Sequence, residues 1–220
     1  MGKSKPPRRI TNRGSRKGHE GRPLKPLIVF AAEGKTERSY LHALNEDRYD
    51  SRFAFKFAGR RDQSSLSNLV ESLRQWERTS AEPSDAFWIV CDRDQNECHK
   101  EKLDKWIKES KEHYAAISVP CIEYWFLLHI RQSIYSVDAL QMSKEFEVAW
   151  EEGSLKGVYK KGGEIPSDLI GLTDAAVKNA LCRHCSLNGD LGVWSSRQWT
   201  DMPELISVLD KLDPVKSNSD

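Results

Sequence analysis

The chain has 220 residues, of which 38% are hydrophobic and 30% are charged, so it can bury the core of a globular domain. No apolar run approaches the roughly 18 residues of a membrane-spanning helix, and we expect no secretory signal because the N-terminus is basic without an apolar segment behind it. The five cysteines are an odd number, which favours reduced thiols over a disulfide framework. We therefore expect a cytoplasmic protein that does not contact a membrane.

The positive charge is concentrated at the N-terminus. Residues 1–26 carry nine basic side chains and one acidic one, which leaves 25 basic and 32 acidic side chains for the rest of the chain. Four prolines and few aliphatic residues predict a flexible arm, because such a segment buries too little to offset the entropy of ordering. A basic arm on an acidic body can hold a polyanion in a salt-dependent way. The alternative is a solubilising tail that contacts nothing.

Strand and helix patterns alternate in the first half of the chain. Continuous apolar runs at 27–32 and 86–91 predict buried strands, and alternating apolar residues at 53–57 and a short run at 115–119 predict two more. Helical periodicity between or after these strands predicts helices at 36–45, at 64–78, around Leu103 and Trp106, and at 123–130. Asp62 and Ser64 are the candidate capping residues of the helix at 64–78. This alternation predicts an α/β fold of the Rossmann-like kind, with a mostly parallel central sheet flanked by helices.

Strand patterns fade from about residue 136 onward. Helices are predicted at 137–150 and 173–182, separated by a glycine-rich loop at 153–163, and a final apolar helix follows Asp201 as its capping residue. We therefore divide the chain into a basic arm (1–26), an α/β domain (27–134), a helical C-terminal extension packed on the sheet (135–213) and a disordered tail (214–220).

Acidic residues follow three of the predicted strands. Glu33 comes directly after the first strand, Asp92 and Asp94 follow the third, and Glu123 lies just beyond the fourth. In open α/β sheets, ligands bind at the carboxyl ends of the strands. In extended backbone, Asp92 and Asp94 project to the same side, about 6.6 Å apart at their Cα atoms. Magnesium prefers such carboxylate oxygens, so Glu33 and the aspartate pair predict a Mg²⁺ or Mn²⁺ site if the first and third strands are neighbours.

Each of these acids has a simpler interpretation when taken alone. A single carboxylate at a strand end can be a helix-dipole partner or a solvated loop charge, whereas several at independent strand ends favour a site. Cys182 and Cys185 have zinc-like spacing but lack a second pair at a matching distance, so buried or partly buried thiols are the better interpretation. His129 is best interpreted as a core or hinge residue, with a catalytic or nucleic-acid-binding role as the alternative.

The acidic motifs resemble those of a known family. Glu33-Gly34-x-Thr36-Glu37 after one strand and Asp92-x-Asp94 after another are similar to the Toprim domain of topoisomerases, primases and several nucleases. The run from Pro120 to His129, with Glu123 and Trp125 inside it, more closely resembles the RloB-like proteins, which include AbiLii-type abortive-infection proteins. This chain has Ile122 where an aromatic residue is usual. The resemblance covers residues 27–130 well and 195–209 loosely.

The resemblance implies a Toprim-fold, Mg²⁺-dependent enzyme that acts on phosphodiester bonds. Such an enzyme is expected to function in phage defence together with an AAA-type ATPase, which is often encoded next to it. Carried onto this chain, Glu33 is expected to be the general acid/base or to lie next to the metal. Asp92 and Asp94 are expected to bind Mg²⁺, and Glu123 to join the cluster. Lys35 and the pair Arg60-Arg61 are candidates for contacting the nucleic-acid backbone. For the arginine pair, the alternative is that the two surface charges only increase solubility.

The sequence is compatible with three functions. The first is a metal-dependent nuclease acting on DNA or RNA, with tRNA as one candidate, that is triggered with a partner. The second is a non-cleaving subunit that binds nucleic acid or nucleotide and regulates a defence complex. The third takes Asp92-x-Asp94 as the metal motif of a nucleotide-sugar transferase, which leaves the Glu33–Glu37 segment unexplained and therefore ranks last. A homo-oligomer is compatible with all three.

Overall fold

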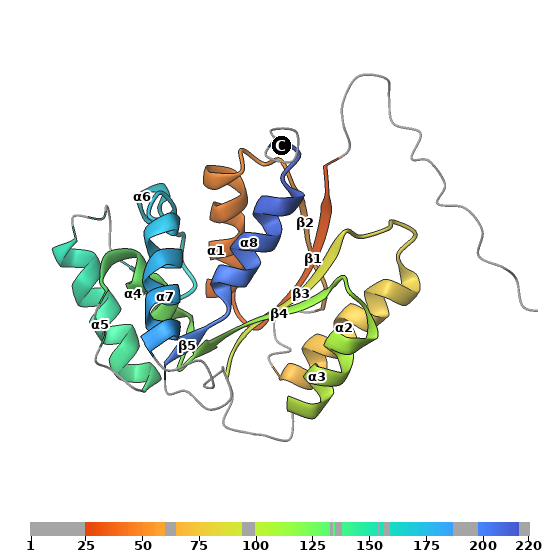
Figure 1. The fold of residues 1–220 in the computed structure, drawn as a ribbon, viewed down its shortest axis with the longest axis horizontal. Coiled ribbons are helices and arrows are strands. Elements are labelled where there is room, and N and C mark those ends of the chain that lie inside the picture. The colour runs from red at the N-terminus through yellow and green to blue at the C-terminus, as the bar shows by residue number, and fades with distance from the viewer. Residues whose placement is uncertain are drawn as a thin grey trace, which may run out of the picture.

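The computed structural model describes residues 25–59, 65–93, 100–132, 134, 138–153, 155, 159–186 and 198–215. A five-stranded sheet in the order β2-β1-β3-β4-β5 forms its centre (Figure 1). The strands are β1 (Leu27–Ala32), β2 (Ala54–Phe57), β3 (Ala86–Asp92), β4 (His113–Val119) and β5 (Trp199–Thr200). The first four strands are parallel to their neighbours, and β5 is antiparallel to β4. The predicted α/β class with a mostly parallel sheet is confirmed.

Helices cover both faces of this sheet (Figure 1). Their bounds are α1 (Lys35–Ala43), which continues as a π-helical turn η1 (Leu44–Arg48), α2 (Leu66–Thr79), α3 (Lys100–Glu109), α4 (Ile122–Ile130), α5 (Ala139–Glu152), α6 (Ser167–Ile170), α7 (Thr173–Ser186) and α8 (Met202–Leu212). The helices α2 and α3 pack on one face, and α1, α4 and α8 on the other, with α5 and α7 outside α4. In the described part of the chain, no helix is long and apolar enough to cross a membrane.

The strand β1 is apolar throughout because both of its faces are covered. Val29 and Ala31 belong to the core under α2 and α3, whereas Ile28 and Phe30 belong to the core under α1, α4 and α8. Alternate residues of a strand point to opposite faces, so a continuous apolar run is what a strand in the middle of a two-sided sheet requires.

The strand β5 and the cap of α2 differ from the sequence-based prediction. The strand β5 was not expected, because two residues are too few to show a periodic pattern. The side chain that caps α2 is that of Ser65, whose Oγ accepts a hydrogen bond from Asn68 N (3.3 Å). The predicted caps, Asp62 and Ser64, lie outside the described residues.

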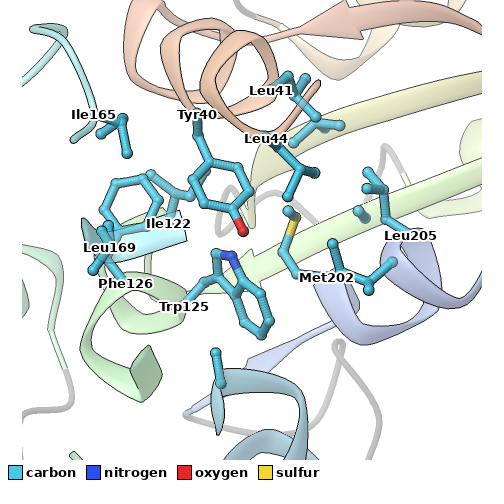
Figure 2. Close-up of a cluster of buried hydrophobic side chains, with 14 of the residues drawn as sticks. Tyr40, Leu41, Leu44, Ile122, Trp125, Phe126, Ile165, Leu169, Met202 and Leu205 are labelled. Atoms are coloured by element: carbon cyan, nitrogen blue, oxygen red, sulfur yellow. The ribbon is translucent and has the colours of Figure 1, made fainter. Parts of the chain in front are cut away.

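The larger core fixes the helices that carry acidic residues (Figure 2). Tyr40 from α1 and Trp125 and Phe126 from α4 are fully buried, and their rings lie 5.3–6.4 Å apart between centroids. Met202 and Leu205 from α8 close this cluster. Because α1 and α4 are anchored through these side chains, the first turn of each helix is held at a fixed position next to the end of the sheet.

Candidate functional site

Glu33 and Asp92 meet at the carboxyl ends of two paired strands. The parallel pairing of β1 with β3 places Ala32 beside Val90, and the amide of Glu33 donates to Val90 O (3.0 Å). The amide of Asp92 in turn donates to Oε2 of Glu33 (3.0 Å). The prediction that the first and third strands are neighbours is therefore confirmed, and it brings these two carboxylates together.

Two further carboxylates come from the first turns of helices. Glu37 lies in the first turn of α1 and is 5% exposed, and Glu123 lies in the first turn of α4 and is fully buried. Acidic side chains near a helix N-terminus are stabilised by the helix dipole. We refer to Glu33, Glu37, Asp92 and Glu123 as the acidic cluster.

A loop from the C-terminal half of the chain packs against this cluster. The hydroxyl of Tyr159 donates to Oε1 of Glu123 (3.1 Å), and Nζ of Lys161 lies 3.9 Å from the same oxygen. The amide of Gly162 donates to Oγ1 of Thr36 (2.9 Å), which ties the loop to the start of α1. The loop thus adds a hydroxyl and an ammonium group to a site that is otherwise acidic.

Burial and neighbouring carboxylates raise the pKa values of two members of the acidic cluster, Asp92 and Glu37. Burial, and then the charges of Glu37, Glu33 and Glu123, hold the pKa of Asp92 well above its usual range. Burial also raises the pKa of Glu37, and Glu123 adds to this effect. The carboxylate of Glu123 is the largest cause of the raised pKa of Lys161. Buried acids with little positive charge around them are typical of a site that binds a cation or a cationic group.

The hydrogen-bonding state of the carboxylates supports the same interpretation. Oδ1 of Asp92, Oε2 of Glu37 and Oε2 of Glu123 are buried and have no hydrogen-bond partner. Buried polar atoms are normally satisfied, so three such oxygens within one cluster require an explanation. Hard oxygen donors of this kind suit Mg²⁺ or Mn²⁺.

The carboxylates do not form a complete ligand set by themselves. Among the residues that the structure describes, no group of three or more His, Cys, Asp or Glu side chains is placed to hold a metal ion directly. Magnesium is commonly bound through one or two carboxylates, with waters and substrate phosphate as the other ligands. The residues present fit that mode of binding, with Asp92 and Glu33 as the residues that would hold the ion.

The structure describes only some of the residues that the sequence predicts for the site. Glu33, Asp92 and Glu123 are brought together, and Lys35 lies exposed at the start of α1 beside them. Asp94 and the pair Arg60-Arg61 lie outside the described residues, as does the basic arm up to residue 24. The cysteines Cys182 and Cys185 are exposed on α7 rather than buried.

Sequence reasoning missed three members of the site. Glu37 belongs to the motif Glu33-Gly34-x-Thr36-Glu37, but the sequence analysis assigns it no role in the site. Its position in the first helical turn after β1 is the signal that could have identified it. Tyr159 and Lys161 gave a weaker signal, because the hydrogen bond that fixes their loop joins residues 126 positions apart. From the sequence alone, residues 159–163 are expected to form a basic, flexible loop that can contact phosphates, with a plain surface loop as the alternative.

A groove lies away from the acidic cluster. It has a volume of about 880 Å³, runs between α7 and α8, and is lined by residues such as Val177, Trp199 and Ile206. None of its lining residues belongs to the acidic cluster. We therefore base the candidate site on the buried carboxylates rather than on the size of a cavity.

Gly34 permits the position of the Glu37 carboxylate. A Cβ atom at residue 34 would lie 2.8 Å from Oε2 of Glu37, so Gly34→Ala has to displace that carboxylate. The backbone φ of Gly34 is −131°, which alanine adopts without strain. We expect Gly34→Ala to change the free energy of unfolding by less than about 1 kcal/mol and to weaken Mn²⁺ binding about tenfold, measured by calorimetry. Unchanged Mn²⁺ affinity would show that Glu37 does not contribute to the site.

His129 contributes to stability rather than to the cluster. Its ring is buried, Nδ1 lies 2.9 Å from Trp125 O, and burial lowers its pKa from 6.5 to about 4. A lowered pKa means that the stabilisation is present above pH 6.5 and is lost as the pH falls toward 4. We expect the free energy of unfolding to fall by about 3 kcal/mol more between pH 7 and pH 4 in the wild type than in His129→Phe. Chemical denaturation across this range measures the difference, and parallel pH profiles would contradict it.

The fold and the site together define a class of protein: an α/β protein whose parallel sheet carries a cluster of carboxylates at its carboxyl edge. The chain matches the RloB-like protein family over residues 27–209, and it belongs to that family. No curated protein and no solved structure shows a significant match to it.

Proposed function

We propose that this protein is a Mg²⁺- or Mn²⁺-dependent nuclease that hydrolyses phosphodiester bonds of DNA or RNA, with tRNA as one candidate substrate. The observation that carries the proposal is the convergence of Glu33, Glu37, Asp92 and Glu123 with three unpartnered carboxylate oxygens. The resemblance to Toprim and RloB-like proteins adds the context: a toxic effector of a cytoplasmic anti-phage defence system, working with an AAA-type ATPase.

The roles follow from position and charge. When bound, Mg²⁺ would offset the negative charge that grows on the phosphate and acidify the attacking water. Glu33 is only partly buried, and its carboxylate accepts a hydrogen bond from the Asp92 amide. In this proposal, Glu33 accepts the proton of that water. The side chain of Lys161 is 68% exposed and lies at the edge of the cluster, where it can pair with a phosphate oxygen.

Replacing Glu33 by Gln tests this function. Gln retains an oxygen that can accept the hydrogen bond from the Asp92 amide, so the variant loses the charge and the basic group but keeps the contact. The purified chain is assayed on plasmid DNA, single-stranded DNA and total tRNA with Mg²⁺, Mn²⁺ or EDTA. We expect metal-dependent cleavage by the wild type that falls by about 10²-fold or more in Glu33→Gln. Glu101→Gln, an exposed acid on α3, is the control and should cleave normally.

The alternative is a non-cleaving, nucleic-acid- or nucleotide-binding regulatory subunit of such a defence complex. It is favoured by one observation, that the described carboxylates do not form a complete ligand set. A wild-type chain that binds nucleic acid but cuts none of the substrates, even with the partner ATPase present, would select this alternative. Cleavage that survives in both EDTA and Glu33→Gln would reject the proposed site.

A further inference from the structure

The exposed face of α1 carries basic residues that lead away from the acidic cluster. Lys35, Arg38 and His42 are spaced three and four residues apart and therefore share one side of the helix. Lys35 and His42 are exposed, and Arg38 is partly exposed. Lys35 follows Glu33 by two residues, so this row begins at the site. It ends one turn after His42, where η1 brings the exposed acids Glu46 and Asp47 to the surface.

An aromatic ring lies beside this row at the edge of the sheet. Phe57 is the last residue of β2, the edge strand. The guanidinium carbon of Arg38 lies 5.0 Å from the centroid of its ring, and the imidazole of His42 lies 4.9 Å from it. Phe30 stacks on the same ring at 5.7 Å and supports it from the core. Phe57 nevertheless remains partly exposed.

The distance from this ring to the acidic cluster is short. In the register of the sheet, Phe57 lies beside Phe30, three residues before Glu33. Three residues of extended strand span about 10 Å. A nucleotide chain can therefore contact Phe57 while a neighbouring phosphate lies at Glu33 and Asp92.

We propose that Lys35, Arg38, His42 and Phe57, which we call the basic–aromatic face, bind single-stranded nucleic acid and direct it into the acidic cluster. This inference rests on the proposed nuclease function and adds the form of its substrate. The cationic side chains bind backbone phosphates, and an unpaired base contacts the exposed part of the Phe57 ring and the exposed imidazole of His42. Bases within a duplex are stacked on one another and leave no free surface for an aromatic side chain.

The test measures binding without catalysis. Fluorescence anisotropy follows labelled single-stranded DNA, single-stranded RNA and the matching duplex in EDTA, over a range of salt concentrations. Phe57→Leu keeps an apolar side chain against Phe30 but removes the aromatic face, and we expect it to weaken single-strand binding by about tenfold. Lys35→Gln and Arg38→Gln should each weaken binding several-fold and reduce its salt dependence. Lys105→Gln, an exposed cation of α3 on the opposite face of the sheet, is the control.

Several results would overturn the inference. These are a wild-type chain that does not bind single strands, duplex binding as tight as single-strand binding, or unchanged affinity in Lys35→Gln and Arg38→Gln. Lys35→Gln changes an exposed side chain, so the test holds even if Phe57→Leu or Arg38→Gln folds poorly. A chain that binds single strands through this face but cleaves nothing would retain the inference and reject the nuclease. If the wild type cleaves and the variants bind single strands as tightly as the wild type, the inference is rejected and the nuclease is retained.

Discussion

Asp92→Asn is expected to reduce metal-dependent cleavage on the order of 10³-fold while the melting temperature stays the same or rises. A loss of this size corresponds to about 4 kcal/mol of transition-state stabilisation, as expected when a residue proposed to hold the metal loses its charge. The fold should not suffer, because Oδ1 of Asp92 is buried without a hydrogen-bond partner and three other carboxylates surround it. An amide of the same shape removes that repulsion.

The combination of the two effects is what makes this variant informative. A residue with a purely structural role would lose stability when replaced, and a solvated charge would change neither property. Asp168→Asn, on the exposed surface of α6, serves as the control for a generic loss of one acid. Wild-type cleavage by Asp92→Asn would contradict the assignment of Asp92 to the site.

Trp125→Ala is expected to lower the free energy of unfolding by about 3–5 kcal/mol. The indole is fully buried and packs against Tyr40 and His129, with ring centroids 6.4 Å and 4.8 Å away. Trp125 also lies two residues after Glu123 on α4. Its loss should therefore disturb the site as well as the core, and cleavage should fall about tenfold or more even at a temperature where the variant is folded.

Trp106→Ala is the matched control for this second effect. Trp106 is equally buried but belongs to the core on the other face of the sheet, where its ring stacks on His113. We expect a similar loss of stability from Trp106→Ala, measured by chemical denaturation, with cleavage by the folded protein largely unchanged. Equal losses of cleavage in both variants would show that the core under α4 has no special role in placing Glu123.

Much of the fold was predictable because its central strands, β1 and β3, are buried on both faces. Continuous apolar runs such as 27–32 identify such strands without any alignment, and alternation with helices predicts their parallel pairing. The convergence of Glu33 and Asp92 then follows from the geometry of parallel strands, because their carboxyl ends lie at the same edge.

The parts that could not be predicted depend on contacts distant in sequence. Asp201 has the pattern of a helix cap, yet its carboxylate accepts hydrogen bonds from Ile117 N (3.3 Å) and Trp199 Nε1 (2.7 Å), and it makes no side-chain cap of α8. The bond from Ile117 joins the end of β5 to β4, across 84 positions of sequence. Lys161 is similar, because only the packing of its loop on α1 brings it to Glu123. Local patterns carry no information about such pairings.

Calorimetric titration of the chain with Mn²⁺, beside Asp92→Asn, tests the central claim most directly, because it does not require the substrate or a partner ATPase. The acidic cluster predicts that the wild type binds Mn²⁺, that Mg²⁺ competes for the same site, and that Asp92→Asn abolishes the binding while keeping its thermal unfolding transition. A wild-type chain that binds no Mn²⁺, or an Asp92→Asn variant that binds it equally well, would contradict the claim that these carboxylates form a metal site.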